Sequence, residues 1–187
     1  VPFSFCIIFG QNETDLINNA RFAQIMYNSH YQGYTPPAKP FVKALPDDKK
    51  VTLLWTNNSE LSKDVVTGYA DFEGYKIYRS TDKYLKDAQI ITDGFGNPMF
   101  YEPLFQCDKI DGITGFSDWA PVFGTSYYLG DDTGIKHKYV DTDVQNGVTY
   151  YYAVVAYDYG LAPNSQIESG IPPSENNAII ELDENEN

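Results

Sequence analysis

The residues of this chain that are best suited to chemistry are acids gathered in one segment. Residues 81–134 hold nine acidic residues against three lysines, a net charge of −6. Carboxylate oxygens are the ligands that Ca²⁺ prefers, so this excess predicts a calcium site with Asp108, Asp111, Asp131 and Asp132 as candidate ligands. The alternative is a solvated loop in which the Asp-Gly pairs form turns.

Aromatic side chains of the same segment suggest a second kind of site. Trp119, Tyr127 and Tyr128 lie close together in the sequence, and such rings stack on the faces of sugars. The alternative, which we favour, is that these rings form the small core that an excursion of 54 residues needs.

Motifs for catalysis are missing from the sequence. It contains no Gly-x-Ser-x-Gly nucleophile motif, no dinucleotide-binding glycine motif and no phosphate-binding P-loop. The two histidines, His30 and His137, have no metal-ligand or nucleophile partner at a useful spacing. We therefore expect a chain that is not an enzyme and carries no cofactor, with a calcium ion as the one alternative left open.

The charge of the chain argues against two classes of partner. Its 26 acidic and 13 basic residues give a formal net charge of −13, so phosphate backbones and anionic lipid surfaces would repel it. No stretch approaches the 18 consecutive apolar residues of a membrane-spanning helix. We expect a protein or polysaccharide partner, no nucleic acid and no membrane insertion.

Only two cysteines, Cys6 and Cys107, are present, and no Cys-x-x-Cys spacing occurs. Ligand count therefore excludes a zinc ribbon or a thioredoxin-type redox site. The two residues are either buried small hydrophobes or, in an exported protein, the halves of a disulfide.

The elements that must position these residues are mainly strands. The clearest is 147–158, where aromatic and β-branched residues alternate with period two between turn residues, which predicts a central strand of an antiparallel β-sandwich. Further strands are expected at 3–9, 41–45, 51–56, 74–80, 89–92, 99–101, 126–129, 135–142 and 178–182. A hairpin should join the pair at 89–92 and 99–101.

One helix is expected near the start of the chain. Apolar residues recur at helical spacing over 11–33, with Asn12 as the cap and Asp15 reaching back to the chain before it. The Pro-rich stretch 34–40 then predicts a stiff, extended linker.

From Pro40 onward the strands resemble a fibronectin type III domain, an immunoglobulin-like antiparallel β-sandwich. The resemblance runs through Trp55, Tyr75-x-Ile77 and Tyr139-Val140-Asp141-Thr142, and it is strongest at Val144-x-Asn146-x-Val148-x-Tyr150. It implies that Tyr150 forms a tyrosine corner, with its hydroxyl bonded to backbone just upstream. Asn146 stands where the family usually has Pro.

The resemblance covers about 90 residues and implies a domain plan. The sandwich spans 40–183 with 81–134 as an insertion, and 184–187 form an acidic tail. The arrangement is similar to modules of large secreted or surface proteins of Bacteroidetes-like bacteria, which makes 1–10 the last strand of a preceding domain.

The sequence thus predicts a non-catalytic structural or adhesive module of a larger exported or cell-surface protein. It would act as a spacer and protein-interaction unit beside neighbouring domains, with Trp55, Tyr75 and Tyr150 as structural residues. The alternative is an accessory carbohydrate-binding module of a secreted hydrolase.

Overall fold

Antiparallel strands make up most of the regular structure, together with one α-helix. The computed structural model describes residues 6–28, 34–65, 67–88, 90–92, 98–117, 126–163 and 170–178. The elements are α1 (Glu13–Asn28), β1 (Val42–Asp47), β2 (Lys50–Trp55), the 3-10 helix η1 (Asn58–Leu61), β3 (Phe72–Ser80), β4 (Ile90–Thr92), β5 (Pro98–Tyr101), β6 (Phe105–Asp108), β7 (Gly115–Phe116), β8 (Tyr128–Gly130), β9 (Lys138–Asp141) and β10 (Tyr151–Asp158).

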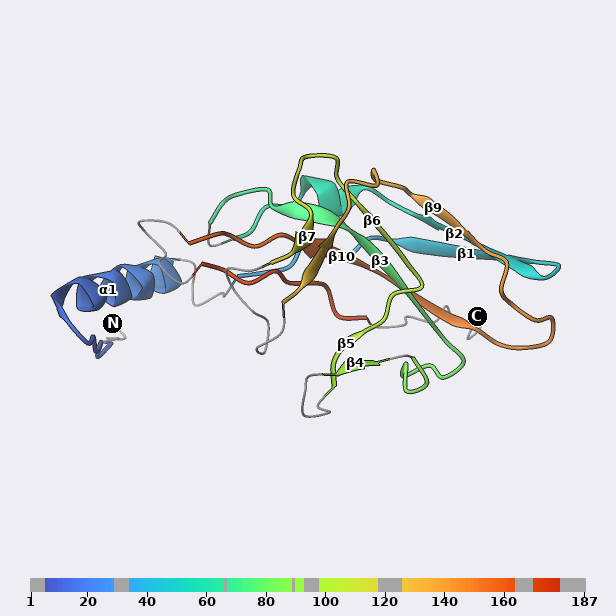
Figure 1. Cartoon of the computed structure of the whole chain (residues 1–187), viewed down its shortest axis with the longest axis horizontal. Coiled ribbons are helices and arrows are strands. Elements are labelled where there is room, and N and C mark those ends of the chain that lie inside the picture. Colours follow the sequence, from blue (N-terminus) through green and yellow to red (C-terminus); the bar gives the residue numbers. More distant parts are fainter. Residues whose placement is uncertain are drawn as a thin grey trace, which may run out of the picture.

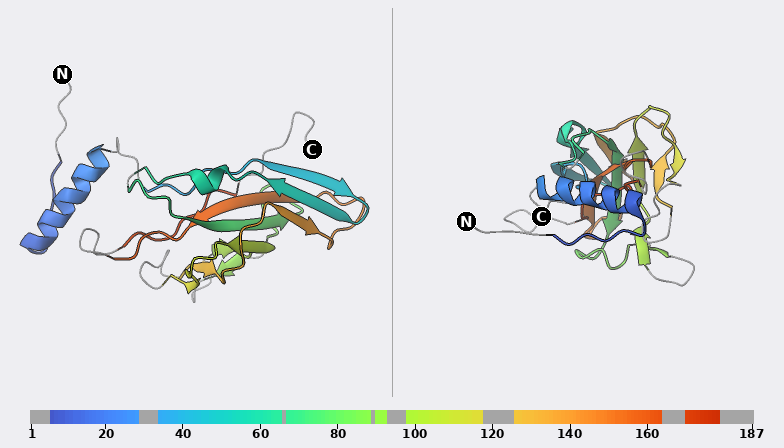
Figure 2. Two further views of the ribbon diagram at one scale, coloured as in Figure 1. Left: turned by 90° about the horizontal axis from the view of Figure 1, so that it is seen from above. Right: turned by 90° about the vertical axis from the view of Figure 1, so that its left-hand side faces the viewer.

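Helix α1 begins as the sequence predicts. The N–H of Asp15 donates to Oδ1 of Asn12 at 3.0 Å, and Oδ2 of Asp15 accepts from the N–H of Gln11 at 2.7 Å. These two bonds use amide groups that a helix start leaves without a partner inside the helix. The helix stands apart from the strands, at one end of the molecule (Figures 1 and 2). Residues 29–33 of the predicted helix lie outside the described residues.

Two three-stranded antiparallel sheets form the body of the molecule, in the orders β1-β2-β9 and β10-β3-β6. Their facing sides enclose the main core. It contains Leu53, Trp55, Phe72, Tyr75, Ile77, Cys107, Val154 and Ala156. Cys107 is buried and Cys6 is exposed, and both are free thiols.

Strand β10 lies at the edge of its sheet order and is nevertheless buried on both sides. It pairs along its length with β3. On its other side, the chain that follows β10 turns back and forms an antiparallel bridge from Glu175 to Tyr157. Strand β10 begins at Tyr151 rather than at the predicted start, because the chain still turns through Gly147, whose φ is +83°.

The 81–134 segment is tied to the body more closely than the sequence predicts. The hairpin of β4 and β5 is confirmed, but β6 was not foreseen, and it pairs with β3 as a full member of the second sheet. Strands β7 and β8 form a small sheet of their own. The segment covers the side of β3 and β10 that faces away from β1 and β2 (Figure 2).

One predicted strand differs from the structure. Residues 6–10 form neither helix nor strand, whereas a strand was expected at 3–9, and 1–5 lie outside the described residues. An apolar run becomes a strand only where a neighbouring strand satisfies its backbone groups. Of the strand expected at 178–182, only its first residue is described. In the part of the chain that the structure describes, no helix has the length and apolar character needed to cross a membrane.

Candidate functional site

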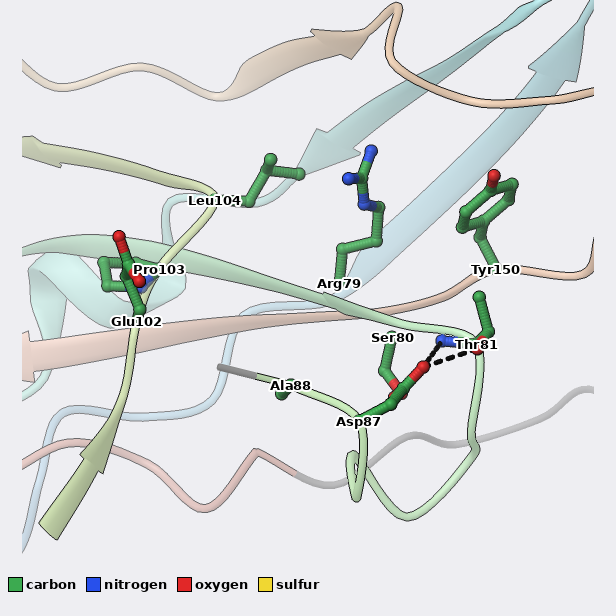
Figure 3. A pocket seen from close by; sticks show the side chains of 9 residues that line it. All are labelled: Arg79, Ser80, Thr81, Asp87, Ala88, Glu102, Pro103, Leu104 and Tyr150. Atoms are coloured by element: carbon green, nitrogen blue, oxygen red, sulfur yellow. Dashed lines mark hydrogen bonds between the residues drawn. The ribbon is translucent and has the colours of Figure 1, made fainter. Parts of the chain in front are cut away.

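The candidate site is a pocket of about 500 Å³ at the end of β3, where the chain also enters β10 (Figure 3). Strand β3 supplies Arg79, the residue before β10 is Tyr150, and the connection from β5 to β6 forms the opposite wall. The lining residues are Arg79, Ser80, Thr81, Asp87, Ala88, Glu102, Pro103, Leu104 and Tyr150.

Arg79 is held by two aspartates of the β9 region. Its Nη1 donates to both carboxylate oxygens of Asp141, at 3.2 and 2.9 Å, and to the carbonyl oxygen of Asp143 at 2.6 Å. Its Nη2 donates to the Asp143 carboxylate at 3.1 Å. The guanidinium also lies 5.6 Å from the ring centre of Tyr150, close enough for a cation–π contact. The positive charge of the pocket is therefore already engaged.

The carboxylate of Asp87 is engaged as well. It accepts from the N–H of Thr81 at 2.8 Å and from the hydroxyls of Ser80 and Thr81. These hydrogen bonds, that of Ser80 foremost, lower the pKa of Asp87. The bonds close the turn after β3, so this acid positions the pocket wall.

Asp108, Asp111 and Asp132, three of the four candidate calcium ligands, come together in space, but their oxygens face amide groups. The buried carboxylate of Asp108 accepts from the N–H groups of Asp132 at 2.6 Å and Thr133 at 2.9 Å. Asp132 in turn accepts from the N–H groups of Asp111 and Gly112, each at 3.0 Å.

These bonds fasten the loop around Asp111 to the loop around Asp132. The carboxylate of Asp111 accepts from the N–H of Ile113 at 3.1 Å and pairs with Lys109 at 2.8 Å. Interaction with the Asp131 side chain raises the pKa of Tyr128 to about 12. Among the described residues, no group of three or more His, Cys, Asp or Glu side chains has the arrangement of a metal site.

The predicted ligand-binding aromatics separate in the structure. Tyr127 is buried with Leu129 and with Tyr157 of β10 in a small core between the 81–134 segment and that strand, so its ring is not available to stack on a sugar. Tyr128 is half-buried and packs against the exposed Phe116, with ring centres 5.1 Å apart. Trp119 lies outside the described residues.

The residues predicted to be structural do lie in structural positions. Trp55 and Tyr75 pack edge to face in the main core, with ring centres 5.8 Å apart. The hydroxyl of Tyr150 accepts from the N–H of Gln145 at 3.2 Å, the upstream backbone contact that the resemblance implies. Of the histidines, His137 contacts Glu60 at 2.6 Å, and His30 lies outside the described residues.

Sequence reasoning missed a buried cluster around Glu175. Its carboxylate accepts from the hydroxyls of Tyr78 at 2.9 Å and Tyr127 at 2.5 Å, and Lys76 approaches it at 3.5 Å. Burial lowers the pKa of Lys76 to about 8, although the charge of Glu175 opposes the shift. The ammonium also lies 3.8 Å from the ring centre of Tyr127. The side chain of Lys76 points away from the main core, and the sequence around it does not indicate that it is buried. The residues that bury it, Tyr127 and Glu175, lie far along the chain.

Glu73 was missed for a similar reason. It is fully buried, and neither carboxylate oxygen has a hydrogen-bond partner within the described residues. The register of β3 with β10 skips this residue at a bulge. Burial first, and then the negative charge of Asp111, raise the pKa of Glu73 to about 8.

Comparisons of the chain with protein-family models, with curated proteins and with solved structures found no match.

Proposed function

We propose that this chain is a non-catalytic module with a fibronectin type III-like β-sandwich fold. It serves a larger exported or cell-surface protein as a rigid spacer and protein-interaction unit. The observation that carries the proposal is the charged brace between the two main sheets, in which Arg79 of β3 holds the buried Asp141 of β9.

The fold part of the proposal draws support from strand order and from two local features. The orders β1-β2-β9 and β10-β3-β6 place strands that are distant in sequence beside each other, as Greek-key connections do. The contact between Trp55 and Tyr75 lies between the sheets. The bond from Gln145 to Tyr150 fastens the chain at the entry to β10.

The spacer part draws support from how the sheets and the insertion are joined. The brace links the sheets at one end of β3. Toward the middle of β3, Lys76 and Tyr78 contact Glu175, which also binds Tyr127 of the insertion. Fully satisfied buried polar networks make a fold rigid. A load applied across the module would therefore act on several side-chain links besides the strand pairing.

Single-molecule pulling from the two ends of the chain tests the spacer role. We expect the residues from Val42 to Asp158 to unfold in one step that releases roughly 400 Å of chain. Arg79→Ala should lower the unfolding force, and Lys83→Ala, an exposed lysine in the turn after β3, should leave it unchanged. Unfolding in several small steps, or an Arg79→Ala variant as strong as the wild type, would contradict the proposal.

A carbohydrate-binding module is the second candidate, and the pair formed by Phe116 and Tyr128 favours it. Phe116 is exposed beside the half-buried Tyr128, so the two rings offer an accessible stacking surface. A glycan array with Tyr128→Ala and Trp119→Ala as controls tests this function. Absence of binding at millimolar glycan would exclude it.

A further inference from the structure

The sheet β1-β2-β9 has one side against the core and one side open to solvent. Leu53, Trp55 and Tyr139 pack in the core, so alternate residues of the same strands point outward. In the strand register, the outward residues form the rows Lys43–Leu54–Lys138 and Leu45–Thr52–Val140. These six residues are called the outer face below.

The apolar residues of the outer face form a diagonal cluster, in which Leu54 neighbours both Leu45 and Val140 and Thr52 stands between those two. Leu45, Leu54 and Val140 are 39%, 37% and 40% exposed, and they come from three neighbouring strands. Single exposed apolar residues are common on protein surfaces, whereas contiguous ones with a polar rim mark interaction sites.

The charges of the outer face oppose the charge of the chain. Lys43 and Lys138 lie on either side of Leu54, and neither forms an ion pair within the described part of the chain. The spacing of strands puts the two lysines roughly 10 Å apart. The nearest acid on the same side of β1, Asp47, is already paired with Lys50 at 3.0 Å. Two uncompensated positive charges thus stand on a protein with a net charge of −13.

Strand β1 makes this surface accessible from its edge. All six residues of β1 are exposed, including Val42, which points toward the side of the core. A groove of about 380 Å³ runs between β1 and β10 and is lined in part by Phe41, Val42 and Tyr152. Phe41 is 76% exposed. A partner on the outer face can therefore extend over the edge of the sheet.

We propose that the outer face binds a protein partner whose surface presents apolar side chains flanked by carboxylates. Lys43 and Lys138 pair with the carboxylates, and Leu45, Leu54 and Val140 cover the apolar side chains. An acidic partner is chosen despite the negative net charge of the chain, because charges more than about 8 Å away are screened at physiological salt and the charges on the outer face are positive. The inference rests on the proposed role as a protein-interaction unit and is independent of the spacer role.

Selection from a displayed library of random 12-residue peptides tests the inference on the intact chain. We expect the enriched peptides to carry net negative charge with interspersed apolar residues. Their affinity should fall at least tenfold in the Lys43→Glu/Lys138→Glu variant, and it should also fall as salt is raised. The matched control is Lys83→Glu/Lys86→Glu, which changes the net charge by the same amount at two exposed lysines and should keep wild-type affinity.

Three results would overturn the inference. They are enriched peptides without an acidic bias, affinity that is equal in the two double variants, and a failure to enrich any peptide that depends on Lys43 and Lys138. A circular dichroism melt of each variant confirms that it is folded. Because pulling experiments measure the spacer role separately, a failure here leaves that result unaffected.

Discussion

The guanidinium of Arg79 on β3 and the carboxylate of Asp141 on β9 join the two main sheets through hydrogen bonds of 3.2 and 2.9 Å. The Asp141 side chain is 1% exposed, and it also accepts from the hydroxyl of Tyr152 at 2.8 Å and from the N–H of Asp143 at 3.0 Å. Three groups, the Arg79 guanidinium, the Tyr152 hydroxyl and the backbone N–H of Asp143, thus converge on one buried carboxylate.

Removal of the arginine should therefore destabilise the fold. Arg79→Ala leaves a buried carboxylate without its counter-charge, and we expect the free energy of unfolding to fall by roughly 2–4 kcal/mol. Urea unfolding followed by circular dichroism measures the change. Asp143→Asn is the matched control, because the Asp143 side chain is 91% exposed and should cost less than about 1 kcal/mol. Equal losses in the two variants would show that the buried pair is not the brace.

The hydroxyl of Tyr150 should make a smaller contribution. Tyr150→Phe removes only the bond from the N–H of Gln145, and we expect a loss of about 1 kcal/mol. Tyr151→Phe removes a hydroxyl for which no such bond is described, so it should change stability by less than about 0.5 kcal/mol. The measurement is the difference between the urea unfolding midpoints of the Tyr150→Phe and Tyr151→Phe variants. A neutral Tyr150→Phe variant would rule out a stabilising corner.

Glu73 should make stability depend on pH. Its pKa is raised from an ordinary value of 4.5 to about 8. The unfolded chain releases this proton near pH 4.5, whereas the folded chain keeps it up to about pH 8, so stability falls as pH rises through that window and then levels off. We expect Glu73→Gln to reduce the loss between about pH 5 and pH 8.5 by roughly 2–4 kcal/mol.

Unfolding by urea at the two pH values measures the effect of Glu73. Glu102→Gln replaces an exposed acid in the connection from β5 to β6 and should retain the wild-type pH dependence. If Glu73→Gln loses as much stability as the wild type between the two pH values, the buried carboxyl group is not the source of the effect.

Chelation tests the predicted calcium ligands. Asp108, Asp111 and Asp132 already accept hydrogen bonds from backbone N–H groups, so we expect EDTA to leave the melting temperature unchanged within about 1 °C. A bound ion at a hundred times its dissociation constant would add about 2.7 kcal/mol. A lower midpoint in EDTA that CaCl₂ restores, and magnesium does not, would establish a calcium site.

Local sequence signals predicted the elements whose structure depends on near neighbours. The cap of α1 uses Asn12 and Asp15, which lie three residues apart. The hairpin of β4 and β5 follows from a glycine-rich turn between two apolar runs. The buried strand β10 follows from period-two alternation. Each signal acts within a few residues, so an isolated sequence carries it.

The tertiary structure alone decided which side chains meet. Nothing near Phe105 indicates that β6 joins β3, and the spacing of Asp108, Asp111 and Asp132 does not reveal the backbone amides from which they accept hydrogen bonds. Tyr127 looks available for a ligand until Glu175, far along the chain, is placed against it.

The physical reason lies in the range of the interactions. The side-chain alternation that makes a strand is repeated every two residues and can be read directly from the sequence. Strand partners, burial and hydrogen-bond partners arise from contacts between distant segments, which many sequences could make in several ways. Local patterns in the sequence therefore indicate most of the helix and strand positions, whereas the packing of distant segments creates the brace between Arg79 and Asp141.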